Sequence, residues 1–392
     1  MRHLRFSAAR GILGFLSILA LGLSLAQFGP LSLPAAAQSA KGASAANQLT
    51  AQLPAVSRLE NGERIEFFTT AAQLSPDGRV WRLPLHGRVY LPVHSVVRNA
   101  VIAQTLKTGF GVVPGRADQM RFDERVDQLL GANKAGRQVF IRIAGRTLAL
   151  PHSDNDGHFT GLIDIPADDA ALAEVDGRVV FSAVLPPRYV QPFEGTVLLV
   201  ARSGRSIISD IDDTVKITNV LDRRRMLEAT FVKPFEAVPG MASLYQTWRS
   251  EGAALHFISS SPWHLYAPLD TFLQNAGFPP ATLSLKKARL TDASILNFFA
   301  DPMKDKPLEI EALLKNYPER TFILVGDSGE KDPEIYAEFW RRFPMRIERV
   351  FIRNMTGAKP DDARFAKVFA GLDATRWQLF SSPDELPKSL RK

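Results

Sequence analysis

Three apolar segments in the second half of the chain each end in a cluster of polar residues. They cover residues 206–209, 253–258 and 321–325. Amphipathic helical patterns separate them, with apolar residues spaced by three, four and seven positions. Alternating strands and helices predict a parallel sheet with helices on both faces, and such a sheet binds ligands at the carboxyl ends of its strands. The three polar clusters are therefore expected at one edge of this sheet.

The first cluster is Asp210-Ile211-Asp212-Asp213-Thr214. Residues i and i+2 of an extended chain point to the same side, so Asp210 and Asp212 can face one phosphate group. Asp210 is the candidate nucleophile, because an attacking carboxylate splits one difficult displacement into two easier ones. Asp212 is the candidate acid/base, which protonates the leaving alkoxide and then deprotonates water. Acidic residues after strands also serve as turn caps, and Asp213 suits that structural role.

The second cluster, Ser259-Ser260-Ser261-Pro262-Trp263, follows the strand at 253–258. Ser259 can donate a hydrogen bond to a phosphoryl oxygen, and Ser260 competes with it for this role. Further along, Lys306 precedes an amphipathic helix and can neutralise charge on the transferred group. Lys304 is the alternative lysine.

The third cluster contains Asp327 and Asp332, which follow the strand at 321–325. Both are candidate metal ligands, because carboxylate oxygens suit hard divalent cations. Asp332 is also a candidate helix cap, since Asp332-Pro333-Glu334 has the composition of a helix start. The two roles are compatible.

These clusters, in this order, resemble the haloacid dehalogenase superfamily of phosphohydrolases. The strings at 209–216, 259–263 and 324–336 more narrowly resemble the catalytic domain of the actin-patch-associated phosphatidate phosphatase family and its bacterial relatives. The resemblance covers about residues 190–355.

The resemblance implies one Mg²⁺, held by Asp210, the backbone carbonyl of Asp212, Asp327 and Asp332. It further implies a phosphomonoester hydrolase of lipid metabolism that forms an aspartyl-phosphate and converts phosphatidate to diacylglycerol and phosphate. The expected partner is therefore a phospholipid or another phosphate ester. The candidate substrate-binding residues are Thr214, Ser260 and Arg223.

Other interpretations remain open. The chain is alternatively a periplasmic phosphatase of soluble phosphate esters, or a non-catalytic envelope-binding protein. Peripheral membrane contact is a further hypothesis, through Arg223–Arg225 or through a set of apolar residues. The alternative for the arginines is a solvated helix face, and ordinary burial against the sheet is the favoured explanation for the apolar set, which is Leu290, Ile295, Leu296, Phe298 and Phe299. Nucleic-acid binding is not expected, because Arg223–Arg225 lacks interleaved aromatic residues.

The N-terminus has the pattern of a secretory signal. Three arginines precede an apolar stretch at 12–26, and Ala35-Ala36-Ala37 provides small residues for cleavage, so residues 1–37 are the expected signal peptide. The alternative is an uncleaved anchor, but the stretch is shorter than the roughly 20 residues of a spanning helix. Cleavage removes three arginines and no acids from the formal charge of +7, leaving +4. The expected location is the periplasm, and with no cysteine the protein has no disulfide.

The remaining chain is expected to form two domains after a flexible leader at 38–57. Residues 58–203 predict a mainly β, sandwich-like domain, with candidate strands at 64–69, 79–91, 138–149, 158–164, 178–185 and 194–201. Helical patterns occur in it at 96–108 and 120–131. Residues 204–392 predict the α/β domain, a Rossmann-like doubly wound parallel sheet of the haloacid dehalogenase type. A small helical cap is expected between Asp212 and Met241.

Overall fold

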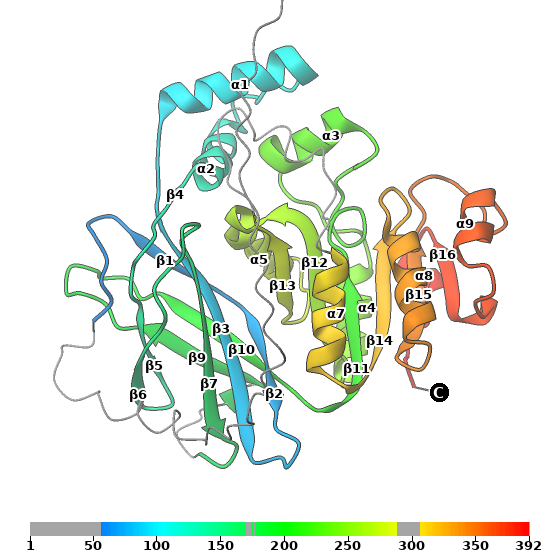
Figure 1. Cartoon of the computed structure of the whole chain (residues 1–392). Coiled ribbons are helices and arrows are strands. Elements are labelled where there is room, and N and C mark those ends of the chain that lie inside the picture. The colour runs from blue at the N-terminus through cyan, green and yellow to red at the C-terminus, as the bar shows by residue number, and fades with distance from the viewer. Residues whose placement is uncertain (1–55, 170–173, 176, 288–305, 392) are drawn as a thin grey trace, which may run out of the picture. The chain divides into compact units, whose positions relative to one another are not determined.

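The computed structural model describes residues 56–169, 174–175, 177–287 and 306–391 (Figure 1). These residues fall within one unit, Pro54–Lys392. The expected signal peptide, nearly all of the leader, Lys304 and the apolar residues between 290 and 299 lie outside the described residues. None of the described helices has the length and apolar character needed to cross a bilayer.

The N-terminal part of this unit builds one mainly antiparallel sheet, as the sequence predicts. Its path is β1-β3-β2-β10-β9-β5-β6, with β4 and β7 paired to β3 and β8 paired to β9. Strands β2 and β10 pair in parallel. The strands are β1 (Arg64–Phe68), β2 (Thr70–Leu74), β3 (Val80–Leu91), β4 (Ala132–Asn133), β5 (Phe140–Ile143), β6 (Arg146–Ala149), β7 (His158–Pro166), β8 (Glu174–Val175), β9 (Arg178–Ala183) and β10 (Glu194–Val200).

This sheet has a hydrophobic core of its own. Leu85 of β3 packs in one buried cluster with Ile141 of β5 and Phe181 of β9, although β3 lies three positions away from β9 in the strand order. The mainly β character of this region is confirmed, and its sandwich-like arrangement stays a prediction, because all of these strands belong to one sheet.

The strand expected at 138–149 is two strands in the structure. The segment 138–149 is a hairpin, because Ala144 and Gly145 turn the chain with φ values of 45° and 69° between β5 and β6. Glycine adopts this left-handed region freely and alanine does not, so the sequence signal for the turn is weak. Strand β2 was not expected either, and its residues Thr70–Leu74 lack strict alternation.

A helical hairpin lies between β3 and β4. It consists of α1 (Val96–Phe110) and α2 (Gln119–Leu129), close to the helical patterns at 96–108 and 120–131. The Ser95 side chain accepts a hydrogen bond from the backbone of Arg98 at the start of α1, and Gly111 ends the helix with φ 67°. Apolar residues of both helices join the core of the second region, a contact between distant segments that local patterns do not predict.

The second region contains a six-stranded sheet of order β13-β12-β11-β14-β15-β16, and every pair is parallel. This confirms the predicted parallel sheet. Its strands are β11 (Ser203–Ser209), β12 (Ala254–Pro262), β13 (Thr282–Lys286), β14 (Glu319–Asp327), β15 (Ile347–Arg353) and β16 (Trp377–Phe380). The chain order changes direction between β11 and β14, and ligands bind at the carboxyl end of such a switch point.

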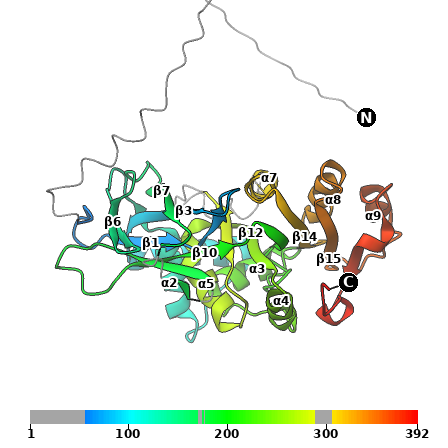
Figure 2. The ribbon, with the colours of Figure 1, turned by 90° about the horizontal axis from the view of Figure 1, so that it is seen from below.

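Helices cover both faces of this sheet. Ile207 packs with α4 (Met241–Ser250) and α5 (Tyr266–Asn275), whereas the next residue, Ile208, packs with α7 (Lys306–Asn316) and α8 (Asp332–Arg342). Figure 2 shows α7 and α8 on one side of the strands and α4 on the other. The final helix is α9 (Ala363–Val368).

The segment between Asp212 and Met241 contains the helical residues that the sequence predicts. They form α3 (Arg223–Leu227) and a π-helical turn at Glu228–Val232. The expected domain boundary at 203/204 falls at the start of β11, and this boundary stays a prediction.

Candidate functional site

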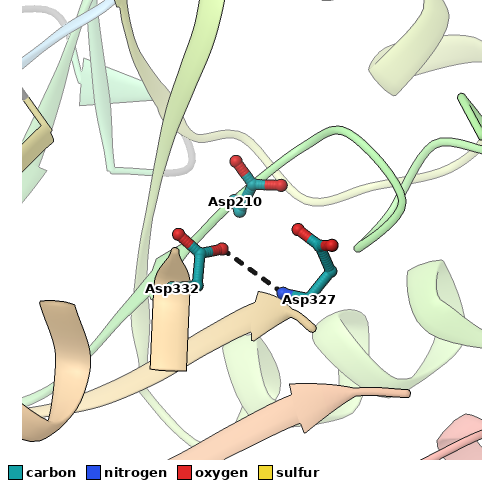
Figure 3. Close-up of side chains that lie close together, drawn as sticks. All are labelled: Asp210, Asp327 and Asp332. Atoms are coloured by element: carbon teal, nitrogen blue, oxygen red, sulfur yellow. Dashed lines mark hydrogen bonds between the residues drawn. The ribbon is translucent and has the colours of Figure 1, made fainter. Parts of the chain in front are cut away.

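Three neighbouring strands bring the predicted polar residues to one edge of the sheet. Strand β11 lies between β12 and β14, so Asp210, directly after β11, lies near Ser259 of β12 and Asp327 of β14. The start of α8 adds Asp332, and the start of α7 adds Lys306. Figure 3 shows the side chains of Asp210, Asp327 and Asp332 lying close together.

Lys306 is the cation of this group. Its Nζ lies 3.0 Å from Asp210 Oδ1 and 3.8 Å from Glu330 Oε2, and it also donates to Asp332 Oδ1. The side chains of Lys306, Asp210 and Asp332 are almost completely buried. Burial lowers the pKa of Lys306, but Asp210 and Asp332 outweigh it and raise that pKa well above its ordinary value. The lysine therefore stays charged.

The three aspartates form a buried set of oxygen donors. One carboxylate oxygen from each of Asp210, Asp327 and Asp332 lies within 4.8 Å of the others. Asp210 Oδ2 and Asp327 Oδ2 are buried without a hydrogen-bond partner among the described residues. Because buried carboxylates without partners are costly, the set fits a hard divalent cation such as Mg²⁺, which prefers oxygen ligands.

The pKa values of these acids reflect their crowding. Burial, then Asp332 and Glu330, raise the pKa of Asp327 to about 8. Burial likewise raises the pKa of Asp210 well above its ordinary value, although Lys306 opposes the shift. Glu330 has its pKa raised to about 7, mainly by burial. Like charges in a desolvated site disfavour ionisation, and a bound cation relieves that repulsion.

Asp212 lies in a different environment, although it is only two residues from Asp210. Its Oδ1 is 2.7 Å from Lys216 Nζ and accepts a 2.8 Å hydrogen bond from Thr218. Its Oδ2 accepts hydrogen bonds from Ser259 at 2.9 Å and from Ser261 at 3.3 Å. Burial alone would raise the pKa of Asp212, but Lys216 and these hydroxyl groups hold it below its ordinary value. Opposed environments for two nearby carboxylates are typical of acid/base sites.

Sequence reasoning missed the residues that hold Asp212. Lys216, Thr218 and Ser261 lie within or beside the motifs at 209–216 and 259–263, but no spacing rule assigns them to this carboxylate. The hydrogen bond that Ser259 donates to Asp212 was not expected from the sequence either.

Asp213 has the structural role that its turn position suggests. Its carboxylate accepts hydrogen bonds from the backbone N–H groups of Thr218, Asn219 and Val220, at 2.8, 2.8 and 2.6 Å. Its φ of 55° is in the left-handed region. The side chain thus fixes the loop that follows the catalytic candidates.

The candidate substrate-binding residues lie in separate places. Thr214 is buried and its Oγ1 has no hydrogen-bond partner among the described residues. Ser260 is partly buried at the end of β12. The guanidinium carbon of Arg223 lies 4.8 Å from the centre of the Phe110 ring, so this side chain contacts the helical hairpin. Substrate binding by these three residues stays a prediction.

Comparisons with known proteins agree with the motifs. Residues 205–354 match the family model described as "Phosphatidate phosphatase APP1, catalytic domain". The chain is 32% identical over 184 residues to phosphatidate phosphatase APP1 of Saccharomyces cerevisiae, which is 46% of this chain and 29% of that protein. It is 31% identical over 180 residues to an uncharacterized protein of Schizosaccharomyces pombe, which is 45% of this chain and 29% of that protein. The match therefore spans less than a third of the length of these relatives.

Similarity to solved structures is weak. A chain of the Pnkp1/Rnl/Hen1 complex is 17% identical, with 38% of this chain and 46% of that chain covered and a TM-score of 0.28. A β-glucuronidase of Parabacteroides merdae is 10% identical, with 74% of this chain and 34% of that chain covered and a TM-score of 0.26. Scores this low support no argument about fold or function.

The assignment therefore depends on the sequence match and on the residues within it. The matched segment contains Asp210, Asp212, Ser259, Lys306, Asp327 and Asp332, all of which lie at the carboxyl edge of the parallel sheet. Residues 205–354 of this chain are similar to the catalytic domain of the phosphatidate phosphatase APP1 family.

Proposed function

We propose that this protein is a Mg²⁺-dependent phosphomonoester hydrolase that acts through an aspartyl-phosphate on Asp210. One observation carries the proposal. Asp210 has a buried carboxylate oxygen without a hydrogen-bond partner in the described part of the chain, while Asp212, two residues away, is held ionised by Lys216. A nucleophile and an acid/base need such different environments. The family match and the order of motifs on the sheet support a haloacid dehalogenase-like fold for this region.

The reaction has two steps. Asp210 attacks phosphorus through a carboxylate oxygen, the bond between phosphorus and the ester oxygen breaks, and Asp212 gives a proton to the leaving alkoxide. Asp212 then takes a proton from water, the resulting hydroxide attacks the acyl phosphate, and inorganic phosphate leaves with Asp210 regenerated. Because the phosphate brings negative charge close to Asp212, substrate binding favours protonation of this otherwise ionised carboxylate.

Charge neutralisation comes from Lys306 and the metal. Lys306 lies against Asp210 and remains cationic, so it stabilises negative charge on the transferred phosphoryl group. Asp210, Asp327 and Asp332, together with the backbone carbonyl of Asp212, would hold Mg²⁺, which supplies further positive charge at the phosphoryl oxygens.

Phosphatidate is the proposed substrate, because the named relative is a phosphatidate phosphatase. This substrate implies contact with a lipid surface. The signal-like residues 1–37 support the proposal that the chain is exported, with the periplasm as its location. Soluble phosphate esters remain the competing substrate class, and phosphate release from each class distinguishes the two.

The test measures phosphate release by the purified protein from phosphatidate in mixed micelles and from glycerol phosphate, with Mg²⁺ or with EDTA. Phosphatidate turnover that depends on Mg²⁺ is expected. Asp210→Asn is expected to abolish it, whereas Asp361→Asn, a change at an exposed aspartate outside the site, retains it. Activity in Asp210→Asn would refute the nucleophile assignment, and turnover of glycerol phosphate alone would refute the lipid substrate.

A further inference from the structure

The helical hairpin α1–α2 lies over the catalytic edge of the second region. Ile102, Leu106 and Phe122 of the hairpin share a buried cluster with Leu227 and Phe231, which lie in α3 and the π-helical turn. Figure 1 shows α1, α2 and α3 on the side of the sheet where β12 ends. The hairpin therefore extends the small cap contributed by residues 213–240, although it lies outside the matched family segment.

The outer face of this cap exposes apolar side chains. Six of the eleven large hydrophobic residues that are exposed in the described part of the chain belong to the hairpin or to the segment just before α3: Val96, Val97, Val101, Val113, Met120 and Leu221. Val96 and Val97 are 73% and 76% exposed, while Ile102 and Leu106 on the opposite face of α1 are buried. The other face of α1 is already buried against the cap, so the exposed valines in its first two turns indicate a contact surface.

The charges of α1 and of the loop that follows it have one sign. Residues 95–117 contain three cations, Arg98, Lys107 and Arg116, and no acidic residue. Arg224 and Arg225 on α3 are also exposed, and they form ion pairs with Glu228 and Asp222, respectively. Exposed apolar side chains and cations on a segment without acidic residues complement the anionic surface and apolar interior of a lipid bilayer.

We propose that the outer face of α1 docks this protein on anionic lipid bilayers. The docked cap then places the catalytic edge near phosphatidate headgroups. This inference rests on the proposed function and deepens it, because it names the surface by which a lipid substrate is reached.

The test compares binding to two kinds of vesicle by flotation. One contains phosphatidylcholine alone, and the other also contains phosphatidylglycerol, which is anionic but has no phosphomonoester. We expect binding to the anionic vesicles and a loss of about tenfold or more in the triple variant Val96→Gln, Val97→Gln, Val101→Gln. The matched control Leu162→Gln, Val180→Gln, Val190→Gln changes three exposed apolar residues outside the hairpin and is expected to bind like the wild type.

A second readout separates docking from folding and chemistry. The α1 variant is expected to lose activity on phosphatidate vesicles and to keep its activity on soluble p-nitrophenyl phosphate within about twofold. Unchanged vesicle binding in this variant would overturn the inference, as would a lipid-independent change in oligomeric state, which would identify a second copy as the occupant. Docking through α1 without phosphatidate hydrolysis would support the surface and refute the proposed substrate.

A separate observation concerns Arg125 on α2. Its guanidinium donates hydrogen bonds to the carbonyls of Thr230, Lys233 and Ala229 at 2.7, 2.8 and 3.3 Å. It also lies 3.9 Å from the centre of the Phe235 ring, and Lys216 Nζ lies 5.0 Å from the same ring. Since Lys216 pairs with Asp212, these contacts connect the hairpin to the candidate acid/base.

We infer that Arg125 is a positioning residue for Asp212. It fixes the loop that ends in Phe235, and this ring limits where the Lys216 ammonium can lie. The effect should appear only where protonation of the leaving group matters, namely with alkyl phosphates and not with p-nitrophenyl phosphate, whose leaving group needs no proton. This inference also rests on the proposed function.

The test compares kcat and KM of Arg125→Met and Arg125→Lys on an alkyl phosphate and on p-nitrophenyl phosphate. Arg125→Met is expected to lower kcat about tenfold for the alkyl ester and less than about twofold for the aryl ester, with KM unchanged. Arg125→Lys should restore part of the loss, since a lysine can still donate to carbonyls. Equal losses on both esters would show a purely structural role, whereas an inactive wild type would refute the proposed function instead.

Discussion

Lys306 Nζ lies 3.0 Å from Asp210 Oδ1 and also donates to Asp332, so one buried ammonium connects the candidate nucleophile to a candidate metal ligand. The residues come from the start of α7, the end of β11 and the start of α8. Because all three side chains are buried, their charges are poorly screened by solvent. The lysine therefore contributes to stability as well as to the proposed chemistry.

Lys306→Met is expected to destabilise the metal-free protein by about 3–5 kcal/mol, because it leaves buried carboxylates without their cation. Phosphate release should fall by about a thousandfold. Lys315→Met on the same helix changes an exposed lysine and is the control. Chemical denaturation and initial rates measure the two effects, and near-normal activity would contradict the role of Lys306.

Metal binding is expected to strengthen as pH rises from about 6 to about 8. The pKa of Asp327 is raised to about 8, so below that pH a proton competes with the cation for this carboxylate. Calorimetric titration with Mg²⁺ at several pH values measures the affinity. An affinity that is constant over this range would show that Asp327 is not a ligand.

The metal-free protein should lose stability as pH rises between the ordinary pKa of 3.8 and about 8. Folding raises the pKa of Asp327, so the unfolded chain releases its proton first and is favoured across this interval. Thermal unfolding in EDTA measures the trend. Added Mg²⁺ should oppose it, because the cation stabilises the ionised carboxylate.

Asp327→Asn is expected to raise the melting temperature of the metal-free protein at pH 8 and to abolish stabilisation by Mg²⁺. An amide removes the buried charge that is repelled by Asp332 and Glu330, but it is a weaker ligand for a hard cation. Thermal shift with and without Mg²⁺ tests both expectations. A variant that still responds to Mg²⁺ would place the metal elsewhere.

Asp213→Ala is expected to destabilise the protein by about 2–3 kcal/mol, because three backbone N–H groups lose their acceptor. Asp213→Asn should lose less stability than Asp213→Ala, since asparagine keeps one acceptor oxygen and tolerates the φ of 55°. Denaturant unfolding of the two variants gives the comparison. Equal losses would point to the carboxylate charge as the decisive property.

Local sequence patterns were sufficient to predict the strands and the site residues of much of the second region. Apolar runs that end in Asp210, Ser259 and Asp327 predict strands whose ends meet at one sheet edge, and the parallel sheet has them there. The turn role of Asp213 also follows from its position beside a strand end. These features depend on residues close in sequence, and periodicity and turn preferences report such short-range relations.

Tertiary structure decided the partners of these residues. Lys216 and Ser259 hold Asp212, and the α1–α2 hairpin packs against residues 227–235, contacts that no local period encodes. The β5–β6 turn at Ala144 likewise has a φ value that its residue type does not favour. By itself the sequence determined which side chains reach the catalytic edge. Their mutual contacts arose only from the folded chain, because long-range packing is the sum of many interactions between segments that are far apart in sequence.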